Sequence, residues 1–232
     1  MVKAVIFDLD DTLYDYDLLN NGAIRNTGMW LCERVNISYD EFEQAFDKGR
    51  HATKELMKNC ASQHNRIIYF QKTSEFLGLN PVKYSIELYE KYWGYMLDHM
   101  KLVPHAEALI KKLNKENIKV AICTDLTTHI QHRKLRKLNI ADYIDAFVSS
   151  EEAGVEKPDK KIFHMTLSKL CVPASDAIHI GDSYNKDIIG ADNAGIFPVW
   201  YNPHGKKTVK SPVKKMLEIN SMIQLERYIF NG

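Results

Sequence analysis

The chain is poor in cysteine, and none of its four cysteines belongs to a C-x-x-C pair. They stand far apart, at Cys32, Cys60, Cys123 and Cys171. The spacing typical of metal-binding or redox pairs is therefore missing. Cys123 lies in an apolar run typical of a strand, where a reduced thiol packs as a small core residue. This usage predicts a reducing compartment.

No charge of one sign dominates, and no apolar run is long enough to cross a membrane. The chain has 31 Lys and Arg against 30 Asp and Glu, so no global field favours nucleic acid or a membrane surface. A membrane span needs roughly 20 apolar residues. The segment MVKAVIFD runs straight into the first expected strand and leaves no room for a signal peptide. We expect a cytoplasmic protein, monomer or homodimer, that binds neither nucleic acid nor membrane.

Against this ordinary background, the stretch KAVIFDLDDTL, residues 3–13, combines a short apolar run with an acidic end. β-branched and aromatic residues bounded by polar ones predict a buried strand. Asp8 and Asp10 are two residues apart, so on an extended chain their side chains point to the same side. Two like charges at such a short distance repel each other unless a cation, a proton or a lysine compensates them. The stretch therefore predicts a metal or a reacting group.

Residues 15–100 carry helical patterns and no convincing strand. Ser38 with Glu41 is a capping-box signature, Gly78 is a helix stop, and Pro81 opens the last segment. Four successive helices predict an all-α unit of the size of a small bundle. The expected helices cover Asp17–Val35, Ser38 towards Cys60, His64–Leu77 and Val82–His99.

From Lys101 onward, helical and strand patterns alternate, which predicts an α/β fold: a doubly wound parallel sheet covered on both faces. The first strand belongs to the same sheet, so residues 1–14 and 101–232 would form the core, with residues 15–100 inserted. The lysine-rich stretch Lys206–Lys215 is expected to be a solvated loop. Expected helices are His105–Glu116, Thr128–Leu138, Asp159–Leu170, Asn185–Gly195 and Met222–Ile229; expected strands are Ile118–Thr124, Ala146–Ser149, Ala177–Gly181, Phe197–Trp200 and, more weakly, Met216–Ile219.

Candidate site residues gather where the expected strands end. Ligands of parallel α/β sheets bind beyond the carboxyl ends of the strands. One such residue alone is usually a turn former or a helix cap, but their joint occurrence predicts a single site. The candidates are Asp8 and Asp10 after the first strand, Thr124 and Asp125 after the second, Gly181, Asp182 and Ser183 after AIHI, Asp187 a turn further along, and Lys157 in a preceding loop.

Together these residue types suit phosphoryl transfer. Asp8 is placed to attack phosphorus and form an aspartyl phosphate. Asp10 lies close enough to protonate the leaving alcohol and then deprotonate the hydrolytic water. Thr124 and Lys157 supply a hydroxyl and an ammonium for the remaining phosphoryl oxygens.

The repulsion between a carboxylate and a phosphate requires a hard cation to bridge them. Mg²⁺ takes carboxylate, phosphate and water oxygens as ligands. We expect Asp8 and Asp182 as carboxylate ligands, and Asp187 beside the metal or bound through water.

Four ordered segments resemble the motifs of the haloacid dehalogenase-like (HAD) superfamily: FDLDDTL, the strand ending at Thr124, VEKPD and IGDSYNKD. The helical insertion after the first segment resembles the cap of the type-one branch. The resemblance implies a Rossmann-like core and a carbonyl oxygen of Asp10 that binds Mg²⁺. It maps the nucleophile onto Asp8, the acid/base onto Asp10, the motif-two hydroxyl onto Thr124, the motif-three lysine onto Lys157 and the motif-four acids onto Asp182 and Asp187.

Within this resemblance, Asp10 separates the branches. Dehalogenases of the family lack the second aspartate because a halide leaving group needs no proton. Asp10 therefore favours a Mg²⁺-dependent phosphomonoesterase that acts on a small phosphoester, such as a nucleoside monophosphate or a sugar phosphate. A phosphotransferase or mutase of the same superfamily and a non-catalytic phosphate-binding module remain open. A receiver-type signalling domain is disfavoured, since such domains are about half this length and lack a cap.

Two features bear on the substrate. The fourth expected helix is rich in aromatics, which either stack on a nucleobase or, as we favour, form the core of the cap. Asp125 stands where many relatives carry Asn or another small neutral residue. An extra negative charge beside a phosphate is unfavourable unless it turns away or binds a sugar hydroxyl or a basic group. We favour a helix-capping role for Asp125 through the amides of Thr127 or Thr128 over contact with the substrate.

Overall fold

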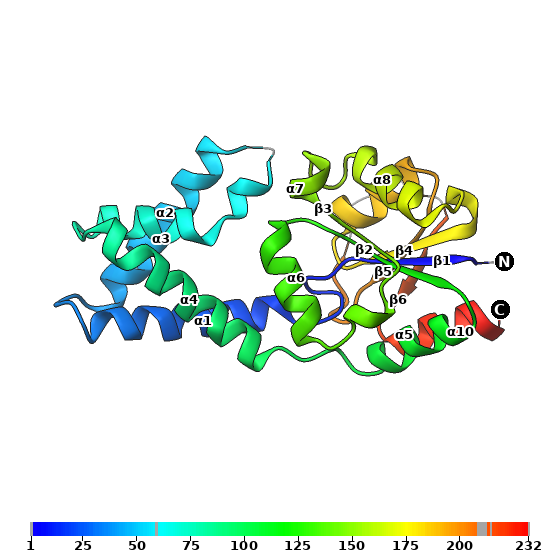
Figure 1. Cartoon of the computed structure of the whole chain (residues 1–232), viewed down its shortest axis with the longest axis horizontal. Helices are drawn as coiled ribbons and strands as arrows, with labels where there is room; N and C mark the ends of the chain where they lie inside the picture. The colour runs from blue at the N-terminus through cyan, green and yellow to red at the C-terminus, as the bar shows by residue number, and fades with distance from the viewer. Residues whose placement is uncertain (1, 59, 208–212, 214, 232) are drawn as a thin grey trace. The chain divides into compact units, whose positions relative to one another are not determined.

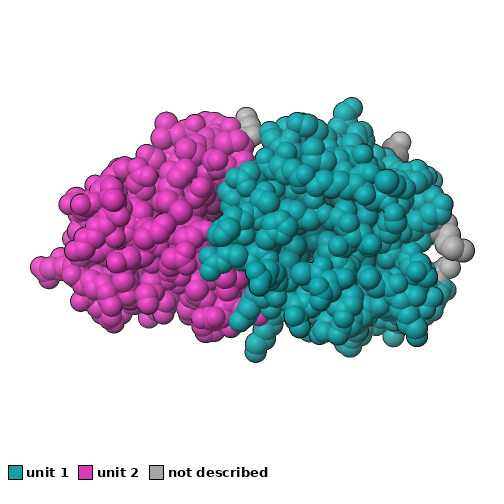
Figure 2. Space-filling view, in the orientation of Figure 1, with its two compact units in different colours: residues 1–15, 101–232 teal, residues 16–100 magenta. Residues whose placement is uncertain are grey.

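The computed structural model describes residues 2–58, 60–207, 213 and 215–231. These residues form two compact units, residues 1–15 with 101–232 and residues 16–100, coloured separately in Figure 2. The first is an α/β unit and the second is entirely helical (Figure 1). The predicted fold class is confirmed. None of the helices within these described residues is long and apolar enough to span a membrane.

The α/β unit is built on one parallel sheet with the strand order β3-β2-β1-β4-β5-β6. β1, which precedes the acidic loop, lies in the middle between β2 and β4. Its last residue, Phe7, is in register with Ile122 of β2 and Ile180 of β4, so β2 runs two residues and β4 one residue past the end of β1. The strands are β1 (Ala4–Phe7), β2 (Lys119–Thr124), β3 (Ala146–Ser149), β4 (Ala177–Gly181), β5 (Phe197–Tyr201) and β6 (Leu217–Ile219).

Helices cover both faces of this sheet, as in other doubly wound folds (Figure 1). On one face, Ala4 and Ile6 of β1 pack with Ile162 and Phe163 of α8 in a continuous apolar core. α5 contacts β2, and α10 packs on α5. The helices of this unit are α5 (Ala106–Lys115), α6 (Thr128–Lys137), α7 (Ser150–Ala153), α8 (Lys160–Leu170), α9 (Ile189–Asn193) and α10 (Met222–Asn231).

The helical unit contains α1 (Tyr16–Cys32), α2 (Tyr39–Leu56), the short 3₁₀ turn η1 (Ala61–His64), α3 (Arg66–Phe76) and α4 (Pro81–His99). The predicted capping box is confirmed, because the Ser38 side chain accepts the Glu41 amide while the Glu41 carboxylate accepts the Ser38 amide. In the aromatic helix α4, Tyr92 and Trp93 are almost completely buried. These two rings pack edge to face, with centroids 4.9 Å apart. They therefore serve the core of the helical unit, as favoured above.

The structure departs from the expected elements at a few places. The helix expected over Asn185–Gly195 is a π-type turn, η4 (Tyr184–Ile188), followed by the short α9. The short α7 and the 3₁₀ turns η2 (Ala141–Tyr143) and η3 (Ala174–Asp176) have no counterpart among the expected elements. Much of the expected loop Lys206–Lys215 lies outside the described residues.

Candidate active site

The candidate residues meet at the carboxyl edge of three neighbouring strands. Asp8 directly follows β1, Thr124 is the last residue of β2, and Gly181 is the last residue of β4. Because these strands are adjacent and parallel, residues from distant parts of the sequence come together there. This edge is the usual ligand site of doubly wound sheets.

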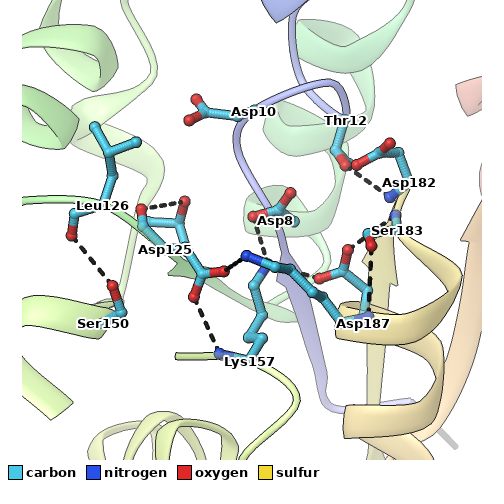
Figure 3. Close-up of polar contacts among 12 residues, drawn as sticks. Asp8, Asp10, Thr12, Asp125, Leu126, Ser150, Lys157, Asp182, Ser183 and Asp187 are labelled. Atoms are coloured by element: carbon cyan, nitrogen blue, oxygen red, sulfur yellow. Dashed lines mark hydrogen bonds and ion pairs between the residues drawn. The ribbon is translucent and has the colours of Figure 1, made fainter. Parts of the chain in front are cut away.

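A buried lysine joins two of the acids. The ammonium of Lys157 lies 2.7 Å from Asp8 Oδ1 and 2.6 Å from Asp187 Oδ1 (Figure 3). Asp187 also bonds the ring of His179 at 3.0 Å, and its second oxygen accepts the amide of Ser183 at 3.1 Å. Asp8, Lys157 and Asp187 are all less than 7% exposed. The three form a compact ionic group with little access to water.

Their surroundings shift the pKa values of Asp8 and Asp187 in opposite directions. Burial raises the pKa of Asp8 well above its usual value, although the Lys157 charge counteracts part of that effect. Burial alone would also raise the pKa of Asp187, but the Lys157 ammonium and the His179 ring outweigh it and hold that pKa far below its usual range. Burial would lower the pKa of Lys157, and the charges of Asp187 and Asp8 raise it instead. Lys157 is therefore positively charged at neutral pH.

Asp182 completes an acidic cluster with Asp8 and Asp187, in which one oxygen of each lies within 4.8 Å of the others. Gly181 permits this approach, because a Cβ there would lie 2.1 Å from Asp187 Cγ. Burial raises the pKa of Asp182, partly offset by Lys206, whose ammonium lies 2.9 Å from Asp182 Oδ2. Three carboxylates against the two ammonium groups of Lys157 and Lys206 leave excess negative charge. This all-oxygen donor set suits a hard divalent cation.

Asp10 is held apart from that group. The ammonium of Lys134, a fully buried residue of α6, bonds both Asp10 oxygens at 2.7 and 2.9 Å. Tyr14 donates its hydroxyl to Asp10 Oδ1 at 2.6 Å. In Figure 3 the carboxylate of Asp10 points away from Asp8. A turn of the Asp10 side chain is therefore needed before it can exchange a proton with a group bound at Asp8.

Thr124 is buried at the end of β2, and its hydroxyl accepts the side-chain amide of Gln131 at 2.7 Å. Gln131 also bonds the backbone oxygen of Asp125 at 2.7 Å. Gln131 of α6 thus fixes the position of the Thr124 hydroxyl, at the strand end next to Asp8.

The helix-capping role favoured for Asp125 is not what the structure contains. The amide of Thr128 is bonded by Glu151 Oε2 at 2.7 Å instead. Asp125 Oδ1 accepts the backbone amide of Lys157 at 3.0 Å, and its Oδ2 lies 2.6 Å from the ammonium of Lys186. Asp125 therefore pairs with a basic group. The sequence contains no indication of this partner, because Lys186 is 61 residues away along the chain.

Sequence reasoning missed several partners of the candidate acids. His179 lies in the apolar run AIHI, which gave no sign of a polar partner, yet its ring bonds Asp187. Thr12 accepts the backbone amide of Asp182 at 3.1 Å and so ties the acidic loop to the end of β4. For Lys134 the only signal was its place on the helix face that also carries Gln131, the buried face of α6.

Comparison with known proteins identifies the family. A sequence profile of the haloacid dehalogenase-like hydrolases matches residues 2–195. The chain belongs to this family. It is accordingly a hydrolase of the HAD type, as its four motifs suggested.

The relatives of this HAD hydrolase include several phosphatases. It is 34% identical to the ribulose-1,5-bisphosphate 5-phosphatase of Halopiger xanaduensis over 206 residues, 88% of this chain and 86% of the relative. It is 29% identical to the pyrimidine 5'-nucleotidase YjjG of Escherichia coli over 97% of this chain and 96% of that one.

Solved structures that resemble this chain include a HAD phosphatase from Thermococcus onnurineus and a 2-haloacid dehalogenase from Pseudomonas syringae. Their TM-scores are 0.76 and 0.78, each at 26% identity with 100% of this chain and 99% of the other covered. Overall fold alone thus does not separate phosphatase from dehalogenase, and the site residues must do so.

Proposed function

We propose that this HAD hydrolase is a Mg²⁺-dependent phosphomonoesterase that works through an aspartyl phosphate on Asp8. The observation that carries the proposal is the buried group of Asp8, Lys157 and Asp187 with Asp182 beside it. This arrangement offers a nucleophilic carboxylate, a fixed cation and a place for a divalent metal. The presence of Asp10 supports a leaving group that requires a proton, and the phosphatases among the relatives support the same choice.

The reaction has two steps. An Asp8 oxygen forms a bond to phosphorus as the bond to the leaving oxygen breaks, and Asp10 gives that oxygen a proton. Water then attacks the phosphorus, Asp10 takes the proton of the water, and the bond from Asp8 to phosphorus breaks to release inorganic phosphate. Lys157 and Thr124 hold phosphoryl oxygens throughout.

The acids Asp8, Asp182 and Asp187, with the backbone oxygen of Asp10, are the residues that would hold Mg²⁺. The bound ion supplies positive charge that offsets the repulsion between the phosphoryl group and the carboxylates. Lys206 would have to give up its bond to Asp182 Oδ2 if that oxygen binds the metal. The helical unit, residues 16–100, would act as a cap that selects the substrate.

The substrate would be a small phosphorylated metabolite, with nucleoside monophosphates and sugar phosphates first among the candidates. Both classes appear among the relatives, in the nucleotidase YjjG and the ribulose-bisphosphate phosphatase. The proposed setting is the cytoplasm. A mutase would use the same acids, and only the accepting hydroxyl would differ.

The test is a phosphate-release screen over nucleotides, sugar phosphates and glycolytic intermediates. We expect free inorganic phosphate from at least one class, no turnover in EDTA, and recovery with added Mg²⁺. Because the raised pKa of Asp8 means that its proton competes with the metal, Mg²⁺ affinity should weaken as the pH falls. Calorimetric titrations at several pH values measure this. Full activity in chelator, or transfer of phosphate only to a second hydroxyl, would contradict the proposal.

The Asp10→Asn variant separates the two steps. With p-nitrophenyl phosphate, whose leaving group needs no proton, we expect a burst of nitrophenol equal to the enzyme present, followed by turnover slowed by roughly 10²–10⁴-fold. With an alkyl phosphate the burst itself should disappear. Rapid-mixing absorbance and a phosphate assay measure these phases. Asp11→Asn, one residue along the same loop, should behave as wild type; unchanged turnover in Asp10→Asn would exclude an acid/base role for Asp10.

A further inference from the structure

The most unusual charge at the site is the carboxylate of Asp125. Its side chain is 14% exposed, and both of its oxygens are engaged by the protein. One oxygen accepts the backbone amide of Lys157, and Figure 3 shows the carboxylate beside the pair formed by Lys157 and Asp8. A substrate phosphate bound to Thr124 and Lys157 would therefore approach a further negative charge, which weakens its binding unless that charge is neutralised.

Lys186 provides the neutralising charge. It precedes Asp187 in η4, and its ammonium lies 2.6 Å from Asp125 Oδ2 and 3.6 Å from Glu156 Oε2. The Lys186 side chain is 40% exposed, so its ammonium keeps contact with water while it pairs with Asp125. The pair links the loop after β2 to the loop before α8 and to η4. Thr124 directly precedes the first of these segments, and Lys157 and Asp187 lie in the other two.

We propose that Asp125 and Lys186 form a charge-balanced positioning pair for the phosphate site. Asp125 fixes the backbone of Lys157, so that the ammonium of Lys157 reaches Asp8. Lys186 holds Asp125 and cancels its charge, so that a phosphoryl dianion binds beside it. The inference rests on the proposed phosphatase function and extends it with two residues that do not touch the reacting atoms. Asp125 thereby acts on the phosphate indirectly, through Lys157, and not by direct contact.

The charges of Asp125 and Lys186 predict the direction in which KM changes in three variants. Lys186→Met leaves the charge of Asp125 uncompensated, so KM for p-nitrophenyl phosphate and Ki for inorganic phosphate should both rise roughly tenfold, with kcat within about threefold of wild type. In Asp125→Asn the amide oxygen still accepts the Lys157 amide, and one negative charge is gone, so KM should equal or fall below that of wild type. The double variant Asp125→Asn/Lys186→Met restores the charge balance, and its KM should return to within about threefold of wild type.

Two further variants separate the specific role of the Lys186 cation from a general effect of net charge on substrate binding. Lys186→Arg keeps the cation and should retain the wild-type KM. Lys160→Met removes an exposed lysine from α8 and reports the effect of net charge alone, which should be less than about twofold. Melting curves on every variant exclude loss of fold as the cause of a raised KM.

The inference is wrong if Lys186→Met leaves KM and Ki unchanged, or if the double variant is no better than Lys186→Met. It is equally wrong if Asp125→Asn alone raises KM, which would assign Asp125 to the substrate. Failure of the phosphatase proposal is a different result: the wild-type enzyme would then release no phosphate, or Asp8→Asn would release it as fast as wild type.

Discussion

Asp8→Asn should reduce phosphate release by at least roughly four orders of magnitude, because an amide cannot form the aspartyl phosphate. The substitution keeps the size of the side chain, and the amide oxygen still accepts a bond from the Lys157 ammonium, which lies 2.7 Å from Asp8 Oδ1. The variant should therefore fold and keep its melting temperature within a few degrees. Steady-state release of phosphate from p-nitrophenyl phosphate, with a melting curve on the same preparation, measures both effects.

Asp11→Asn is the matched control for this experiment. It makes the same chemical change three residues further along the loop, where the backbone has φ 58°. Asparagine tolerates this left-handed conformation, so the loop should keep its shape. Wild-type activity in Asp11→Asn together with loss in Asp8→Asn assigns the effect to position 8. Substantial turnover by Asp8→Asn, or equal loss in both variants, would refute Asp8 as the nucleophile.

The fold was readable from the sequence wherever hydrophobic patterns were regular. β3 and β4 have the predicted bounds, and the capping box at Ser38 marked the start of α2. The segment after β4 was misjudged as one α-helix. There the carboxylate of Asp187 accepts the Ser183 amide, and the chain winds as a π-type turn that brings Asp187 against Gly181. Helical periodicity in a sequence carries no record of such a side-chain contact.

The candidate site was predictable to the extent that it lies in local motifs. Asp8, Lys157, Asp182 and Asp187 lie together in the structure. Asp8 and Asp182 directly follow strands of one sheet, Lys157 lies in the loop between α7 and α8, and Asp187 lies in the turn after β4. Their partners come from elsewhere in the fold. The bonds from Lys134 to Asp10 span 124 positions in the sequence, and the bond from Lys186 to Asp125 spans 61. Long-range ionic pairs of this kind leave no periodicity, so only the folded chain reveals them.

Lys157→Met should reduce stability as well as activity. The substitution removes the cation between two buried carboxylates, which leaves Asp8 and Asp187 facing each other without compensation. Breaking a buried ion pair in this way costs about 3–5 kcal/mol of unfolding free energy. Phosphate release should fall by roughly 10²–10³-fold, because a fixed charge on the phosphoryl group is lost. Lys161→Met, an exposed lysine of α8, is the control for both measurements.

A metal and a second substitution should offset the stability loss of Lys157→Met in different ways. Mg²⁺ binds the same acids and should raise the melting temperature of Lys157→Met more than that of wild type, since it replaces the missing positive charge. Lys157→Met/Asp187→Asn removes one of the two opposed carboxylates, so it should recover part of the unfolding free energy in EDTA but none of the activity. Denaturant unfolding with and without Mg²⁺, paired with phosphate release, separates the two contributions. If Lys157→Met were as stable as wild type in EDTA, the buried ionic group would not be what holds these acids together.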